Sequence, residues 1–190
     1  MNLAALIVKA VAGVNASNMK LTIKVKRINK ALPAPSIVAK GDWIDLRAAE
    51  DVYLSSPYTV QARKDKNRKV LFDNAVVSLG IAMQLPKGFE AIVNTRSSIY
   101  KNYQVMLANN QGVIDNSYKG DKDQWFAHIV AFNDTVIEEG DRICQFRIQL
   151  SQKATVWQKI KWLLSNGVKI KVVNSLDNPN RGGHGHSGVK

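Results

Sequence analysis

The chain has 190 residues, of which 45% are hydrophobic and 22% are charged. This composition fits one globular domain with its own core and excludes a disordered or fibrous protein. The 27 Lys and Arg exceed the 15 Asp and Glu and give a formal charge of +12, which favours an anionic partner such as a nucleotide, a nucleic acid or an anionic membrane. Cys144 is the single cysteine, so no internal disulfide can form, and we expect a reducing compartment and a small buried thiol.

Residues 1–18 are rich in Ala and Val and resemble a signal sequence only superficially. Lys9 interrupts the apolar run, no basic region precedes it, and no stretch reaches the roughly 20 apolar residues that span a bilayer. We therefore expect neither a targeting segment nor membrane association. Because Met19 directly precedes the first strand pattern, residues 1–18 are interpreted as a dispensable or poorly ordered extension.

Short strands dominate the rest of the chain. Leu21, Ile23 and Val25 alternate with polar or basic residues, which is typical of a half-exposed strand. Further short apolar runs, separated by turn residues, lie at positions 52–54, 76–83, 91–93, 105–108, 125–132, 143–150 and 168–173. The charged stretch 63–68 is expected to be a hairpin or loop. Many short strands with frequent turns predict an all-β sandwich or barrel.

One helix is predicted, over residues 155–165. Thr155 can serve as its N-cap and Gly167 lies just past its end. Its apolar residues fall at helical spacing, at Val156, Ile160, Leu163 and Leu164. We expect this stripe to pack on the barrel or on a neighbouring subunit, with docking of a protein partner as the alternative.

Five short motifs carry the functional signal. They are residues 41–48 (Gly-Asp-Trp-Ile-Asp-Leu-Arg-Ala), 95–98 (Thr-Arg-Ser-Ser), 109–121 (Asn-Asn-Gln-Gly-Val-Ile-Asp-Asn-Ser-Tyr-Lys-Gly-Asp), 140–146 (Gly-Asp-Arg-Ile-Cys-Gln-Phe) and 181–188 (Arg-Gly-Gly-His-Gly-His-Ser-Gly). In this order they resemble the signature motifs of the trimeric dUTP pyrophosphatases, the dUTPases. The resemblance runs from about Met19 to Lys190.

This resemblance implies a distorted jelly-roll β-barrel over residues 19–175 and a flexible C-terminal arm over residues 176–190. It implies hydrolysis of dUTP to dUMP and pyrophosphate, in the cytoplasm of a cell or of a bacterial host. It also implies a homotrimer in which each site takes motifs from three chains, so that a monomer is inactive.

Asp115 is the expected catalytic base. The strand pattern places this carboxylate among apolar neighbours close to a turn at Gly120, where a carboxylate is either paired or functional. Hydrolysis at a phosphorus atom needs a base that takes a proton from a positioned water, and the resemblance gives Asp115 that role. The alternative is that Asp115 caps the following turn.

The resemblance assigns recognition of the nucleoside to the third motif. Asn109, with the main chain of Gly112 and Ile114, would bind uracil, and Tyr118 would pack beneath the deoxyribose. Two structural alternatives remain. Asn109 is also a common turn residue, and Tyr118 is also a candidate for a buried barrel tyrosine.

The second and fourth motifs would hold the phosphates, through Arg96, Ser97, Ser98 and Gln145. Asp45 of the first motif would meet Mg²⁺ through the water shell of the ion, or would form an ion pair with an Arg of another motif. Asp141 and Arg142 are expected to make a turn and a structural ion pair. No His and Cys spacing indicates zinc.

The fifth motif departs from the family pattern. Arg181, Gly183, Gly185 and Ser187 are retained, which favours a glycine-hinged arm that closes over the γ-phosphate. The family usually has a Phe at the position of His184, and that Phe stacks over the uracil.

A ring from the body of the protein is therefore expected to cover the base. We favour Phe126, with Trp125 buried beside it, over His184. The alternative is that both Phe126 and Trp125 pack in the core.

Three other functions were weighed. A dCTP deaminase, or a bifunctional relative that makes dUMP from dCTP, shares the implied fold but resembles the third and fifth motifs less. A phage-type dUTPase could also regulate a protein partner through the helix at 155–165. A basic nucleic-acid-binding barrel leaves the ordered motifs unexplained, so no stable nucleic-acid complex is expected.

Overall fold

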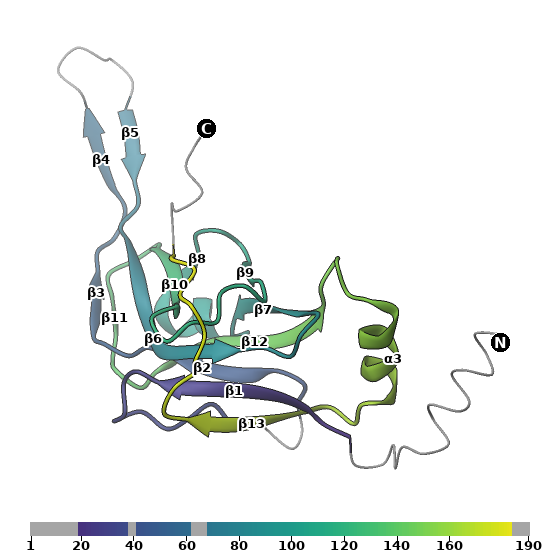
Figure 1. Cartoon of the computed structure of the whole chain (residues 1–190). Coiled ribbons are helices and arrows are strands. Elements are labelled where there is room, and N and C mark those ends of the chain that lie inside the picture. The colour runs from purple at the N-terminus through teal and green to yellow at the C-terminus, as the bar shows by residue number, and fades with distance from the viewer. Residues whose placement is uncertain (1–18, 38–40, 62–67, 184–190) are drawn as a thin grey trace, which may run out of the picture.

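The structure is a computed structural model that describes residues 19–37, 41–61 and 68–183 (Figure 1). Its elements, in chain order, are β1 (Leu21–Arg27), β2 (Ile44–Arg47), β3 (Val52–Leu54), β4 (Tyr58–Gln61), β5 (Arg68–Leu71), β6 (Asn74–Gln84), β7 (Phe89–Thr95), α2 (Ile99–Tyr103), β8 (Val105–Leu107), β9 (Gly112–Ile114), β10 (Gln124–Ala131), β11 (Thr135–Ile137), β12 (Arg142–Leu150), α3 (Val156–Leu164) and β13 (Val168–Val173). The prediction of an all-β protein with a short inserted helix near residues 155–165 is confirmed, and the short helix α2 was not predicted.

Two sheets form the body of the molecule. One has five strands in the order β13-β1-β6-β10-β8, and the other has four in the order β2-β12-β7-β9. Strands β11 and β3 form a separate pair, as do β4 and β5. In the described part of the chain, hydrogen bonding thus divides the strands among separate sheets, and the core lies between the two larger ones.

Alternation of apolar and polar residues explains the core. In β1 the side chains of Leu21, Ile23 and Val25 are buried while the intervening residues are partly exposed. In β10 the same pattern buries Trp125, whose ring packs edge-on against Phe146 of β12 at a centroid distance of 5.2 Å. The sequence analysis predicted that Trp125 is buried, and the structure confirms this prediction. This contact joins the two sheets.

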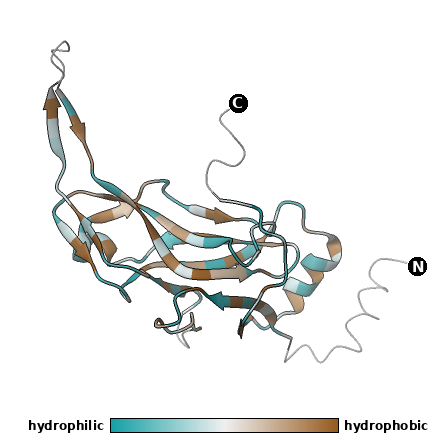
Figure 2. Cartoon of the chain, turned by 60° about the vertical axis from the view of Figure 1, so that its left-hand side comes forward, coloured by the Kyte–Doolittle hydropathy of each residue, from teal (hydrophilic) through white to brown (hydrophobic). Residues whose placement is uncertain are grey.

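A hairpin projects from the body (Figures 1 and 2). Its strands β4 and β5 pair antiparallel, with Tyr58 opposite Leu71 and Gln61 opposite Arg68. The charged stretch 63–68, predicted to be a hairpin or loop, lies between these paired strands, but residues 62–67 are outside the described residues. The described part of the chain contains no helix long and apolar enough to cross a membrane.

Helix α3 begins at the predicted N-cap. The Oγ1 of Thr155 accepts a hydrogen bond from the Gln158 amide at 3.4 Å, and Gln158 Oε1 accepts one from the Thr155 amide at 2.7 Å. This reciprocal pair is a capping box. The ring of Trp162 packs on Phe89 at 5.3 Å and ties the helix to the body.

The apolar stripe of α3 is only partly covered by this chain. Ile160 and Leu164 are half-buried, whereas Val156 is exposed and Leu163 is 81% exposed. Trp162 and Gln158 contact the body, so the expectation that the stripe packs on the barrel holds for one part of the stripe only. Packing on a neighbouring subunit stays a prediction.

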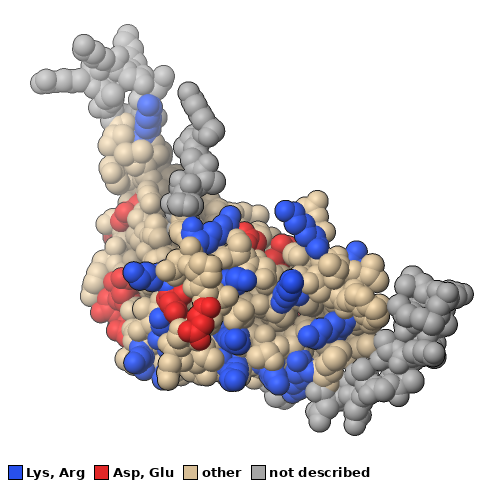
Figure 3. Space-filling view, viewed as in Figure 1, with Lys and Arg blue, Asp and Glu red and all other residues tan. Residues whose placement is uncertain are grey.

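Lys and Arg side chains are scattered over the face shown in Figure 3, and a group of acidic side chains lies toward the end where β3 and β11 pair. Cross-strand neighbours Lys24 and Lys171 share one face of the β1–β13 pair. Lys26 on the same face forms an ion pair with Asp121 at 3.1 Å. The strands thus present lysines outward while their apolar residues face the core.

Candidate active site

The third motif forms a hairpin against the four-stranded sheet. Strand β9 pairs antiparallel with β7, so that Gly112 lies opposite Val93 and Ile114 opposite Ala91. A Cβ at Gly112 would lie 3.2 Å from the Cβ of Val93, which is a tight contact. Glycine therefore allows the hairpin to lie close to β7.

Asn116 fixes the end of this hairpin. Its Nδ2 lies within hydrogen-bonding distance of three main-chain oxygens in the β6–β7 turn, at 3.2 Å from Leu85, 2.8 Å from Pro86 and 3.3 Å from Phe89. Sequence reasoning missed this residue. Its partners are main-chain groups some thirty positions away, which a local pattern cannot show.

Asp115 lies directly beside this anchor and its side chain is 46% exposed. One oxygen accepts hydrogen bonds from the Ser117 amide, at 2.7 Å, and from the Ser117 hydroxyl. The other forms an ion pair with Arg181 of the C-terminal arm. Partial burial raises the pKa of Asp115, but the bonds from Ser117 and Arg181 outweigh it and hold the pKa below its usual range. Asp115 is therefore ionised at neutral pH.

The loop before β9 leaves Asn109 available. Asn110 adopts a left-handed conformation with φ of 59°, and its amide bonds to the Leu107 carbonyl at 3.1 Å. Asn109 is exposed, and within the described residues no hydrogen bond of its side chain is found. Its main-chain oxygen accepts from the Gln111 amide at 2.6 Å. Asn110 thus provides the strained turn position, while the Asn109 side chain is free for another role.

Tyr118 lies between the hairpin and the arm. Its hydroxyl donates to the Gln124 carbonyl at 2.7 Å, and a Cβ at Gly183 would lie 3.4 Å from that hydroxyl. Burial and the nearby Asp123 raise the pKa of Tyr118. Asp115, Ser117, Tyr118 and Arg181 are called the hairpin group below.

Residues of the other motifs meet on the four-stranded sheet. Asp45 of β2 forms ion pairs with Arg96 at 2.9 Å and with Arg142 at 3.0 Å, one through each carboxylate oxygen. The ion pair predicted for Arg142 is confirmed, and Asp141 makes the predicted turn through a bond from the Glu138 amide.

Gln145 lies beside this cluster. In β12 it pairs with Asp45 of β2 on one side and with Asn94 of β7 on the other. Its Nε2 donates to the Thr95 carbonyl at 3.3 Å. Ser97 and Ser98 follow Arg96 at the start of α2, and Ser98 occupies the N-cap position without a side-chain capping bond. Asp45, Arg96, Arg142 and Gln145 are called the sheet group.

The hairpin and sheet groups are separate within one chain. Asp115 follows the pair Ala91–Ile114, whereas Arg96 lies beyond Val93–Gly112 at the other end of the ladder. Extending the register places the Cα atoms of Asp115 and Arg96 about 20 Å apart. No hydrogen bond or ion pair joins the two groups within residues 19–37, 41–61 and 68–183.

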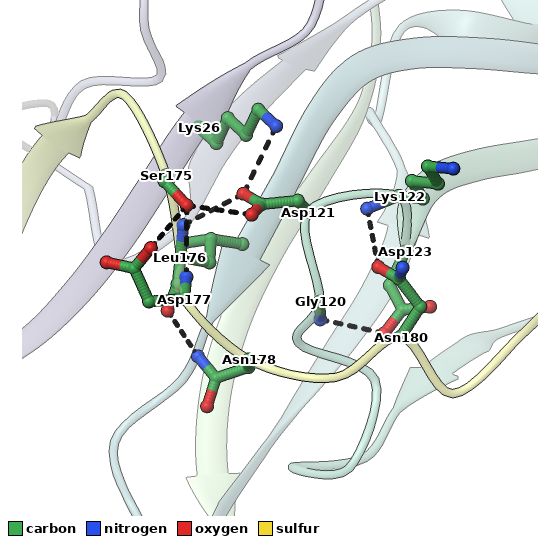
Figure 4. Close-up of polar contacts among 10 residues, drawn as sticks. All are labelled: Lys26, Gly120, Asp121, Lys122, Asp123, Ser175, Leu176, Asp177, Asn178 and Asn180. Atoms are coloured by element: carbon green, nitrogen blue, oxygen red, sulfur yellow. Dashed lines mark hydrogen bonds and ion pairs between the residues drawn. The ribbon is translucent and has the colours of Figure 1, made fainter.

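Two carboxylates that sequence reasoning missed bind the C-terminal segment (Figure 4). Asp121 accepts hydrogen bonds from the Leu176 amide and the Ser175 hydroxyl, both at 2.8 Å. Asp123 accepts bonds from the amides of Arg181 and Gly182. The arm is thus attached to the loop that follows Tyr118.

Of the other predicted site residues, some lie outside the described residues and Phe126 lies within them. His184, Gly185 and Ser187 lie outside the described residues. Phe126 is partly buried on the outward side of β10, in register with Ser78 of β6, whereas Trp125 faces the core. The alternative that both rings pack in the core is therefore wrong for Phe126.

Metal-ligand chemistry can be tested against the sheet group. Among the described residues no cluster of three His, Cys, Asp or Glu could hold a metal ion. Both oxygens of Asp45 are already paired with arginines. The sheet group could therefore lie near a metal ion such as Mg²⁺ that keeps its water ligands and is bound mainly by the substrate phosphates. It does not form a site in which protein side chains alone coordinate the metal.

Comparison with known proteins identifies the family. The sequence model of the dUTPase family matches residues 45–161. The SPbeta prophage-derived deoxyuridine 5'-triphosphate nucleotidohydrolase YosS of Bacillus subtilis is 43% identical over 170 residues, which cover 90% of this chain and 100% of that protein. The chain belongs to the dUTPase family.

Solved dUTPases share the fold. The dUTPase from Streptococcus mutans aligns with a TM-score of 0.55 at 20% identity and covers 70% of this chain and 98% of its own. The Staphylococcus bacteriophage 80alpha dUTPase aligns with a TM-score of 0.54 at 18% identity, over 70% of this chain and 93% of its own. That phage protein is described as controlling the transfer of virulence genes. These likenesses place the two sheets in the jelly-roll architecture of dUTPases.

Acid is expected to destabilise this member of the dUTPase family. The bonds from Leu176, Ser175 and Lys26 lower the pKa of Asp121 to about 2, whereas an unfolded Asp titrates near ~3.9. A lowered folded-state pKa adds stability that is complete above the unfolded value and is lost as the pH falls through the folded value. The thermal midpoint should therefore fall steeply between about pH 4 and pH 2.

Asp121→Asn provides the matched comparison. The variant lacks this contribution at every pH, so it should melt lower than the wild type at pH 7 and lose less on acidification. Parallel melting curves from pH 7 to pH 2 measure both effects. Identical pH dependence in the two proteins would exclude Asp121 as a source of the acid sensitivity.

Proposed function

We propose that this protein hydrolyses dUTP to dUMP and pyrophosphate, with Asp115 as the base that activates the attacking water. The observation that carries the proposal is the pairing of Asp115 with Arg181, because it joins the third and fifth motifs at one exposed carboxylate. Family membership supports the same reaction. The Ser117 amide and hydroxyl bind one oxygen of Asp115, so its second oxygen is the one that faces the arm.

The environment of Asp115 suits a base that is ionised before substrate arrives. Ser117 binds one oxygen, which fixes the direction of the other. Replacement of the Arg181 contact by a water would leave that second oxygen free to accept the proton. Arg181 would then be available to the phosphate oxygens that gain charge.

The sheet group would bind the triphosphate. Arg96 and Gln145 present donors on one face of the sheet, and the hydroxyls of Ser97 and Ser98 lie next to Arg96 in sequence. A substrate phosphate would compete with Asp45 for Arg96. A bound Mg²⁺ would neutralise charge on the phosphates, with Asp45 near its water shell.

Separation of the two groups supports a shared site. About 20 Å between Asp115 and Arg96 is too far for the reacting phosphate of a single nucleotide to contact both side chains of one chain. A second chain that brings its Arg96 to the hairpin would complete the site. We therefore propose a homotrimer whose sites are shared between subunits. Because Arg181 meets Asp115 within one chain, two chains would supply these motifs to a site, and not the three chains that the resemblance implies.

Selection of uracil and deoxyribose would come from the hairpin. The exposed Asn109 side chain and the main chain near Gly112 and Ile114 can match the polar edge of uracil. Tyr118 is fixed by its bond to Gln124, so a ring held in place can exclude a 2'-hydroxyl. Such a site would distinguish uracil from other bases, because a wrong base would leave buried polar groups of the site without hydrogen-bond partners.

Pyrophosphate release tests the proposed reaction. The purified protein would be incubated with dUTP, dCTP, dTTP or UTP, with and without Mg²⁺. We expect rapid release from dUTP alone. Release of ammonia from dCTP would identify a deaminase instead, and no release from any nucleotide would overturn the proposal.

A ring is expected to cover the base, because base stacking contributes on the order of 1 to 3 kcal/mol. Phe126→Ala should therefore raise the Michaelis constant for dUTP about tenfold, and His184→Ala should change it less. Correctly folded trimers of both variants would be compared with wild type. A large rise only in His184→Ala would contradict the role of Phe126, and no rise in either would exclude a replacement ring.

A second function, regulation of a protein partner, is favoured by one observation. Helix α3 exposes Trp157 and Leu163 on this chain, and the phage 80alpha relative is described as a regulator. Leu163→Glu separates this function from trimer packing. Retention of the trimer and of dUTP hydrolysis would leave α3 free for a partner, whereas loss of the trimer would assign the stripe to the neighbouring subunit.

A further inference from the structure

Asp123 is the single charged or polar residue that is fully buried in the described part of the chain, at 1% exposure. A buried carboxylate is costly unless hydrogen bonds compensate it. Here all the recorded donors are main-chain amides. Asp123 is also outside the five motifs that resemble those of dUTPases.

The donors come from two segments. Lys119 and Gly120 donate to Oδ2 at 3.1 and 2.7 Å and hold Asp123 to its own loop. The Arg181 amide donates to both oxygens at 3.0 Å, and the Gly182 amide donates to Oδ1 at 3.2 Å. Burial raises the pKa of Asp123, but these amides lower it by more, so the carboxylate is charged when it binds the arm.

Close approach of the chain supports the same attachment. A Cβ at Gly120 would collide with Asn180, at 2.6 Å from its Cα and 2.8 Å from its nitrogen. Gly120 is not among the glycines with positive φ, so the backbone itself would allow alanine. Asn180 also accepts a bond from the Lys122 amide at 2.8 Å (Figure 4). Glycine at position 120 is therefore required by the passage of the arm.

We propose that Asp123 is a positioning residue, which fixes the main chain at Arg181 and Gly182 so that the arm enters the active site with the Arg181 side chain directed at Asp115. The proposal rests on the proposed hydrolysis of dUTP. It adds a fixed attachment point for the arm, beside Tyr118 and on the same loop as the base hairpin.

Fixing the main chain at this point has a kinetic consequence. Asp123 holds the main chain at Arg181 and Gly182 before substrate binds. Less conformational entropy is then lost when Arg181 engages the substrate. The left-handed Gly182, with φ of 86°, provides the direction change directly after the attachment.

Asp123→Asn is the principal test. The amide keeps the shape of the side chain, but its NH₂ group would face main-chain N–H groups and at least one arm bond would be lost. We expect turnover of dUTP to fall about tenfold in the full-length trimer. Asp134→Asn is the control, because Asp134 also accepts a hydrogen bond from a main-chain amide, that of Ser56, but lies in the β10–β11 turn.

A double-mutant cycle separates positioning from general stability. Asp123→Asn would be combined with deletion of residues 181–190, and turnover compared with the deletion alone. If Asp123 acts through the arm, the substitution should change the truncated enzyme by less than about twofold. An equal loss in the full-length and truncated enzymes would overturn the proposal, as would wild-type turnover in full-length Asp123→Asn. Absence of dUTP hydrolysis in the wild type would instead refute the proposed function.

Amide hydrogen exchange gives a direct measurement. Protection at Arg181 and Gly182 should be present in the wild type and lost in Asp123→Asn. If that variant does not fold, Gly120→Ala keeps the carboxylate and displaces the arm through Asn180. It should show the same loss of protection and turnover at a melting temperature near that of the wild type. Unchanged protection would overturn the proposal.

Discussion

Asp115→Asn is expected to slow dUTP hydrolysis by at least about a hundredfold, as loss of a general base typically does. The substitution keeps an oxygen that can accept from Ser117 but removes the charge that pairs with Arg181. Because the side chain is 46% exposed, the fold should tolerate the change. The loss should therefore appear in turnover, with little change in the binding of a non-hydrolysable dUTP analogue.

Stopped-flow or coupled assays of pyrophosphate release, with binding measured by calorimetry, separate the two quantities. Asp134→Asn is again a suitable control, because it removes a carboxylate at a distant turn. Wild-type turnover in Asp115→Asn would remove Asp115 from the mechanism. A large loss of binding with unchanged turnover would make Asp115 a binding residue.

Deletion of residues 181–190 is expected to lower turnover on the order of a hundredfold, comparable to the loss of a preorganised donor to developing charge. The deletion removes the Arg181 partner of Asp115 and the arm residues His184, Gly185 and Ser187. It removes none of the core residues that the structure describes, since Leu176 is the last buried apolar side chain among residues 19–37, 41–61 and 68–183. The thermal midpoint and the trimer should therefore change little.

Size-exclusion chromatography with light scattering gives the assembly state, and the same pyrophosphate assay gives turnover. Arg181→Ala in the full-length chain distinguishes the side chain from the rest of the arm. Unchanged turnover in the truncated protein would show that the arm has no catalytic part. Loss of the trimer would make the arm a structural element.

Much of the fold was predictable because strand periodicity and burial are local properties. Leu21, Ile23 and Val25 alternate in the sequence and all three are buried. The capping residue Thr155 likewise predicts the start of α3. Cys144 is buried as expected, and burial raises the pKa of its thiol to about 12. In each case the outcome depends on neighbours within a few positions.

The orientation of α3 was not predictable in the same way. Its apolar stripe predicts a buried face, but Trp162 determines which side meets the body. The Trp162 ring packs on Phe89 and leaves Val156 and Leu163 of the stripe exposed. A periodic pattern shows on which side of a helix the apolar residues lie. It does not show which surface of the protein, or of a neighbouring subunit, this side packs against.

The candidate site was predictable in its residues but only partly in its contacts. The resemblance of the motifs identified Asp115, Arg96 and Asp45. Asp115 and Arg96 directly follow β9 and β7, whereas Asp45 lies within β2. The resemblance did not identify Asn116 or Asp123, because these side chains bind main-chain groups of distant segments and any sequence offers such groups. Resemblance likewise assigned Asp45 to Mg²⁺, whereas in this chain it pairs with two arginines.

The parallel pairing of β1 with β13 sets the order in which the protein can mature. Strand β1 leaves the ribosome well before its edge partner β13, because Leu21 pairs with Val168, which is far later in the sequence. Contacts between such distant segments form slowly, because a long loop must close before they contribute. The segment that Asp121 and Asp123 hold follows β13 directly. A nascent chain can therefore assemble the sheets and the base hairpin while the arm is still unattached, so catalytic competence would arise only after synthesis of the whole chain is complete.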